Sequence, residues 1–112
     1  MPHNRDWNLR ISDIKLAITD IENFMINIKS LDSFKNNKVV FYAVLKALEI
    51  IGVACHHVPV NIKEKYPDIP WTVIKDFRNH LAHEYFGVDE SIVWDTIIND
   101  ISELKKALLK IT

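Results

Sequence analysis

The residues with the richest chemistry in this chain lie in one short stretch, residues 76–89, which reads DFRNHLAHEYFGVD. An arginine guanidinium can hold phosphate oxygens in a planar fork, and a histidine can accept or donate a proton near neutral pH. An asparagine can orient either group by hydrogen bonding. Arg78, Asn79 and His83 therefore suit the cleavage of a phosphodiester without a metal.

Regular helix geometry does not bring these groups together. Asn79 and His83 are four residues apart and share a face, but Arg78 and His83 are separated by about 140° at 100° per residue. Tyr85 lies about 160° from His83 by the same rotation. Convergence of Arg78, His83 and Tyr85 therefore needs either an unwinding of the helix before Gly87 or a second copy of the chain across a two-fold axis.

The same residue types also permit structural roles. Arg78 could pair with Asp76 or Glu84, His83 could be a satisfied interior histidine, and Tyr85 could be an amphipathic core residue. These structural roles are the main alternative to a catalytic site.

Two further candidate sites are weaker. His80, His83 and Glu84 have the three- and four-residue spacings that can converge on one metal ion, but they do not match a His-Glu-x-x-His motif and no cysteine pair accompanies them. Neither a metal nor a cofactor is therefore expected. Cys55 lies within an apolar stripe, which predicts a buried and inert thiol rather than a nucleophile.

Composition limits the class of protein. The 112 residues predict one domain, residues 1–112, and the 48% hydrophobic content with only two glycines favours an all-α fold. The formal net charge is -1 without a basic tail, so any polyanion must be bound locally. The single cysteine and the polar N-terminus predict a cytoplasmic location. Residues 39–55 fall short of the ~20 apolar residues of a membrane span, so no membrane is expected as a partner.

The hydrophobic pattern predicts about four long helices in an up-and-down bundle, with no strand. The first helix is expected to run from Arg5 to near Leu31, and the second from about Val40 until Pro59 ends it. A connector over 59–70 includes one short turn near 62–66. A third helix from about Ile69 carries the stretch at 76–89, and Asp89 is expected to cap the last helix. The heptad-like stripes of the first and last helices favour self-association.

The spacing Arg78, four residues, His83, one residue, Tyr85 resembles the signature of the HepT-like HEPN ribonuclease toxins. The flanking segments agree in order and spacing over most of the chain: AVLKALEIIG at 43–52, PDIPW at 67–71 and VWDTIINDI at 93–101. This resemblance implies an all-α, HEPN-like bundle that dimerises, places both motifs in one cleft and cuts RNA there without a metal.

The resemblance also implies roles for individual residues. Arg78 would stabilise the charge on the phosphate, His83 would act as general acid and base, and Asn79 would support them. The implied partners are an RNA substrate and a small nucleotidyltransferase antitoxin of the MntA kind, which adenylylates Tyr85 and could join the homodimer in a higher assembly.

One position departs from the family pattern. The family commonly has Gly-Glu-Ala at the end of the second helix, whereas this chain reads Gly52-Val53-Ala54. The adjacent His56 or His57 could take the place of the missing carboxylate, although the two side chains point about 100° apart. Two alternatives to the ribonuclease stay open: a catalytically inactive HEPN module that serves as a partner- or nucleotide-binding dimer, and a purely structural helical dimer.

Overall fold

The computed structural model describes residues 7–71 and 89–111, and within these ranges the regular secondary structure is entirely helical. The all-α, HEPN-like fold class is therefore confirmed. The elements are α1 (Trp7–Phe24), α2 (Leu31–Lys35), α3 (Lys38–His56), α4 (Val60–Lys65), α6 (Glu90–Asp95), the π-helix η2 (Thr96–Ile101) and α7 (Ser102–Leu108).

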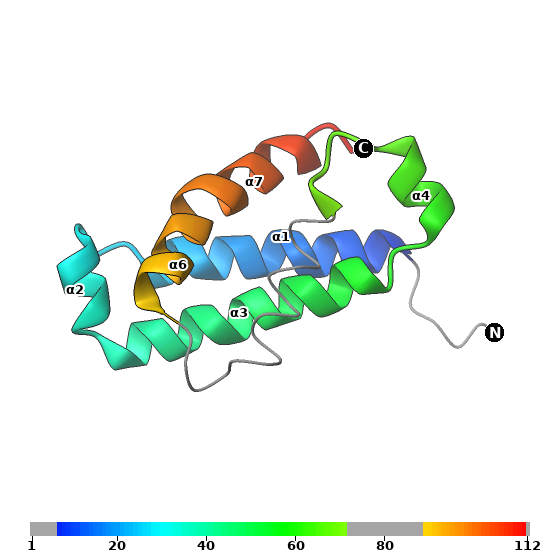
Figure 1. Cartoon of the computed structure of the whole chain (residues 1–112). Helices are drawn as coiled ribbons and strands as arrows, with labels where there is room; N and C mark the ends of the chain where they lie inside the picture. The colour runs from blue at the N-terminus through cyan, green and yellow to red at the C-terminus, as the bar shows by residue number, and fades with distance from the viewer. Residues whose placement is uncertain (1–6, 72–88, 112) are drawn as a thin grey trace.

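The core lies between α1, α3 and the C-terminal helices. Figure 1 shows α1 and α3 running side by side in opposite directions, and these two helices form the most extensive contact between described elements. The C-terminal helices pack on α1 through α7, and α2 joins α3 to α6 at one end of the molecule. The largest side chains that are almost completely buried are Ile14, Ile21, Phe34, Val44, Ile51, Val93, Leu104 and Leu108.

The first helix is shorter than its apolar stripe predicts. It ends at Phe24, and tight turns follow in which the N–H of Ile26 donates to the carbonyl of Asn23 and that of Ile28 donates to Met25. Met25 and Ile28 still pack against the core, so the stripe continues beyond the helix. Ser30 caps the short helix α2 by accepting a hydrogen bond from the N–H of Ser33 at 3.1 Å.

The second helix lies in the core, but Pro59 does not set its end, contrary to the prediction. α3 ends at His56, and the N–H of His57 donates to the carbonyls of Val53 and Ala54. Pro59 is the N-cap residue of α4, which confirms the predicted short turn in the connector. By length and composition α3 could cross a membrane, a test that the core helix of a soluble protein also passes.

The last helix is capped as predicted but is not regular throughout. The Asp89 side chain accepts a hydrogen bond from the N–H of Ser91 at 2.7 Å. Residues 96–101 then form a π-helix, which the hydrophobic pattern did not predict. The buried Thr96 hydroxyl donates to the carbonyl of Ile92 at 2.8 Å, and this contact competes with the backbone hydrogen bonds of a regular α-helix.

Candidate functional site

The predicted site residues Arg78, Asn79, His83 and Tyr85 lie outside the described residues. The same is true of His80 and Glu84, which formed the alternative metal site, and of most of the predicted third helix. The described residues instead define how the chain enters and leaves the stretch 72–88, and what chemistry the surrounding helices offer.

The chain is firmly anchored where it enters this stretch. Ile69 is 3% exposed, and the indole of Trp71 packs against the core while its Nε1 donates a hydrogen bond to the carbonyl of Tyr66 at 3.1 Å. The ammonium of Lys63 lies 5.8 Å from the centroid of the Trp71 ring. An anchored aromatic side chain therefore precedes Arg78 by seven residues.

The chain is also anchored where it leaves the stretch. The Asp89 cap starts α6, and Val93 and Trp94, four and five residues after the cap, reach the core. Trp94 contacts Phe34 of α2 with ring centroids 5.8 Å apart, and Phe34 contacts Phe41 of α3 at 5.7 Å in an edge-to-face geometry. This aromatic cluster ties α2, α3 and α6 together.

Val53, the departure from the family pattern, lies in a groove between α1 and α3. The groove has a volume of about 240 Å³, and Arg10, Asp13, Lys46 and Glu49 also line it. Glu49 stands one helical turn before Val53, so the groove keeps carboxylates although position 53 has none. Lys46 and Glu49 form an exposed ion pair with Nζ 3.7 Å from Oε2.

The two histidines that follow are not part of this groove lining. His56 and His57 are exposed, and their rings pack against each other edge to face with centroids 5.3 Å apart. Because neither histidine lines the groove, the structure does not support the idea that His56 or His57 replaces the missing carboxylate.

Arg10 is a polar residue that the sequence interpretation missed. Its Nε atom is buried and has no hydrogen-bond partner among the described residues. Arg10 precedes the completely buried Ile14 by four residues, so the helical pattern of α1 already places it toward the inner face. That spacing was the available signal.

Cys55 behaves as the sequence predicts. It is 3% exposed, and burial raises the pKa of its thiol to about 12, although nearby Lys63 acts in the opposite direction. A thiol with such a pKa is almost entirely protonated at neutral pH and is therefore a poor nucleophile. Among the described residues no group of three or more His, Cys, Asp or Glu side chains could hold a metal ion.

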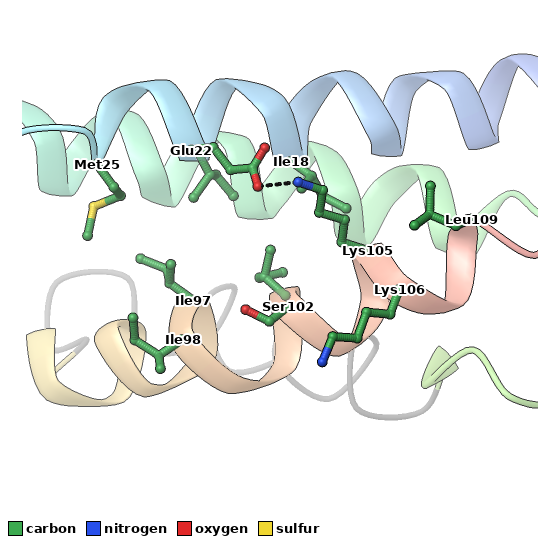
Figure 2. A pocket seen from close by; sticks show the side chains of 11 residues that line it. Ile18, Glu22, Met25, Ile97, Ile98, Ser102, Lys105, Lys106 and Leu109 are labelled. Atoms are coloured by element: carbon green, nitrogen blue, oxygen red, sulfur yellow. Dashed lines mark hydrogen bonds and ion pairs between the residues drawn. The ribbon is translucent and has the colours of Figure 1, made fainter.

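A second groove, of about 560 Å³, lies between α1 and the C-terminal helices. Figure 2 shows Ile18, Met25, Ile97 and Ile98 along its walls and Lys105 reaching across to Glu22. The Lys105 Nζ is 2.6 Å from Glu22 Oε2, so the chain bridges its own groove with an ion pair. We regard this groove as part of the packing between helices, because its one carboxylate is already engaged.

The comparisons with known proteins agree with the fold. Residues 14–111 match the family model described as "Ribonuclease HepT-like". A protein of Methanocaldococcus jannaschii named "Putative RNase" is 43% identical over 107 residues, which cover 96% of this chain and 88% of that protein. A second protein of this name and organism is 44% identical over 105 residues, covering 88% of this chain and 90% of the relative.

A relative from Thermococcus cleftensis, named "Probable ribonuclease HepT", is 41% identical over 95 residues, which cover 85% of this chain and 86% of that protein. No solved structure gives a significant match. The family model covers most of the chain, and the relatives align over most of their own length. The chain therefore belongs to the HepT-like ribonuclease family.

Proposed function

We propose that this protein is the toxin of a toxin-antitoxin system and a metal-independent endoribonuclease that cuts RNA at a cleft between two copies of the chain. The observation that carries this proposal is the Arg78, His83 and Tyr85 spacing in a member of the HepT-like family. The anchored chain on both sides of the stretch 72–88 supports it, because a catalytic group must be held by rigid neighbours.

The proposed chemistry uses two side chains. His83 takes the proton of the ribose 2′-hydroxyl, the 2′-oxygen attacks the phosphorus, and the bond to the 5′-oxygen breaks with return of a proton to that oxygen. Arg78 stabilises the charge that develops on the phosphate oxygens, and Asn79 supports the pair. The products are a 2′,3′-cyclic phosphate and a 5′-hydroxyl.

A second copy of the chain would resolve the geometric conflict between Arg78 and His83. Large apolar side chains that remain exposed on α1 and α3 support such an association: Leu16 is 62% exposed, Tyr42 57% and Val39 80%. Sedimentation equilibrium of the purified protein would give the mass of a homodimer if this is correct.

The decisive experiment is cleavage of a bulk RNA in EDTA by the wild type, Arg78→Ala and His83→Ala. We expect each substitution to lower the rate by at least about 10², with cyclic phosphate ends on the wild-type products. Lys35→Ala, which removes an exposed cation of α2, is the matched control and should cleave normally. Cleavage that survives in both motif variants would refute the proposal.

Neutralisation is a separate part of the proposal. A nucleotidyltransferase antitoxin would transfer adenylate from ATP to the Tyr85 hydroxyl, with release of pyrophosphate and the hydroxyl proton, and the added negative charge would then repel the RNA phosphate. Intact mass after co-expression with such an enzyme should increase by adenylate groups, and Tyr85→Phe should remove the increase. Full neutralisation of an unmodified protein would contradict adenylylation without affecting the ribonuclease.

The alternative function is a catalytically inactive module that binds a partner or a nucleotide, and Val53 is the observation that favours it. Under this alternative the unmodified wild type would not cleave RNA, and its expression without an antitoxin would not slow growth. Val53→Glu separates the two cases, because it adds a carboxylate to the groove that Val53 lines. Cleavage gained only by this variant would support the inactive module for the natural chain.

A further inference from the structure

Lysines lie beside aromatic rings at the end of the molecule formed by α4 and the loop that follows it. The Lys63 ammonium is 5.8 Å from the centroid of the Trp71 ring, and the Lys65 ammonium is 5.7 Å from that of Tyr66. The hydrogen bond from Trp71 Nε1 to the Tyr66 carbonyl joins the two halves. We call Lys63, Lys65, Tyr66 and Trp71 the α4 patch.

Two carboxylates are close to this patch in the sequence, Glu64 between the two lysines and Asp68 in the loop that follows α4. Asp68 is engaged by Lys110, with Oδ2 3.5 Å from Nζ, and Figure 1 shows the C-terminus beside the loop that follows α4. Within residues 7–71 and 89–111, neither Lys63 nor Lys65 forms an ion pair with a carboxylate. Both ammonium groups therefore keep hydrogen-bond donors for an external anion.

The contacts with the rings also prepare the lysines for binding. A free lysine side chain loses considerable rotational freedom when it is fixed on a phosphate, and this loss opposes binding. A cation–π contact restricts the side chain before the ligand arrives, while three N–H donors remain on each ammonium. Phosphate binding at the α4 patch should therefore cost less entropy than binding at two isolated surface lysines.

The position of the patch in the chain connects it with the motif. Trp71 is seven residues before Arg78, so even a fully extended chain separates their Cα atoms by at most about 25 Å. The whole protein has a formal net charge of -1, so it cannot attract RNA by its overall charge and needs a local cationic surface.

We propose that the α4 patch binds the RNA backbone, with Lys63 and Lys65 on phosphates of the strand that Arg78 and His83 cut. This inference rests on the proposed function and adds a substrate-contacting surface to it. The residues of the patch bind and position the strand and take no part in the chemical step.

The test is a binding measurement that does not depend on cleavage. All proteins carry His83→Ala, and fluorescence anisotropy with a labelled single-stranded RNA is recorded in EDTA at several salt concentrations. We compare the parent with Lys63→Ala/Lys65→Ala and with Lys35→Ala/Lys38→Ala. The second pair removes two exposed cations, at the last residue of α2 and the first residue of α3. Circular dichroism melts verify that all three proteins are folded.

We expect the α4 variant to bind RNA about tenfold more weakly at low salt, because two phosphate contacts are lost. The slope of log affinity against log salt should become shallower by about 1.4, which is the value for two contacts on a single strand. The control variant should stay within about twofold of the parent, and Lys63→Arg/Lys65→Arg should restore most of the affinity.

Equal losses in the α4 variant and the control would overturn the inference, because they would show an effect of overall charge. Unchanged binding by the α4 variant, or no binding by the parent, would overturn it as well. Failure of the proposed function gives a different result, namely RNA binding that depends on the patch without any cleavage by the wild type.

Discussion

Replacing Phe34 by alanine should severely destabilise the protein, although Phe34 lies on a helix of only five residues. Its side chain is 0% exposed and contacts Phe41 and Trp94 with centroid distances of 5.7 and 5.8 Å. Phenylalanine-to-alanine changes in cores cost about 3–5 kcal/mol, and the two aromatic contacts place this site toward the upper end. A domain of this size has about 5–15 kcal/mol of total stability.

The assay is chemical denaturation followed by circular dichroism, with Phe34→Leu as the matched control. Leucine keeps most of the apolar volume, so we expect this variant to lose about 1.5–2.5 kcal/mol, including the lost aromatic contacts. Phe34→Ala should also lower the RNA cleavage rate before global unfolding, because Phe34 supports the helix that follows the motif. A loss below about 1 kcal/mol for Phe34→Ala would refute the interpretation of Phe34 as the residue that ties α2, α3 and α6 together.

Two predictions concern titratable groups. Because burial raises the pKa of Cys55 to about 12, native protein at pH 8 should react with a thiol reagent about 10³ times more slowly than protein unfolded in guanidinium, and fast labelling of the folded state would contradict this. Burial, and then the carboxylates of Glu103 and Asp95, raise the pKa of Asp100 above 3.8, so the folded state holds this proton more tightly than the unfolded chain. The contribution of Asp100 to the free energy of unfolding is therefore greatest below pH 3.8, and it falls as the pH rises through the raised pKa. Asp100→Asn should raise the melting temperature at pH 7 and leave it unchanged at pH 3, and an equal gain at both pH values would refute the assignment.

The long helices could be predicted from the sequence because their buried stripes repeat at the helical period. Ile11, Ile14, Ile18 and Ile21 alternate by three and four residues, and all four are buried in α1. The cap of the last helix was also predictable, since Asp89 precedes the stripe and its side chain bonds to the backbone as expected.

The short helix α2 could not be predicted from periodicity, because five residues contain little more than one turn. Such a helix does not form by itself, since nucleation is unfavourable. Phe34 stabilises it through burial against other helices, and Ser30 and Asp32 complete its first turn. The same polar residues are equally common in turns, so their types alone do not indicate a helix.

The π-helix could not be predicted either, because the spacing of the buried apolar residues does not by itself distinguish it from a regular α-helix. Val93, Ile97 and Ile101 are separated by two successive steps of four, and on a regular helix such steps drift by about 80° around the axis. A π-helix turn holds more residues and removes this drift. α3 has the same double step at Ala47, Ile51 and Cys55 but stays regular, because its buried face is wide. The last helix differs from α3 in the hydrogen bond that the buried Thr96 hydroxyl donates to the Ile92 carbonyl.

For the site, the sequence supplies the motif and the structure supplies its anchors. Arg78 and His83 were identified by residue type and spacing, and their roles stay predictions because they lie outside the described residues. The anchors, Trp71 and the cluster around Phe34, depend on contacts between segments far apart in the chain. Such contacts have no local signature in the sequence.

The distribution of charge explains how a protein with a net charge of -1 could act on RNA. On the C-terminal helices, burial and then the carboxylates of Glu103 and Asp95 raise the pKa of Asp100, while Lys105 and Lys106 lie in the last turn of α7. Lys63 and Lys65 lie on α4, where the adjoining Asp68 is engaged by Lys110. Lys63 and Lys65 thus offer a local cationic surface, and we expect RNA to approach from the side of α4, which precedes the segment with Arg78 and His83 in the sequence.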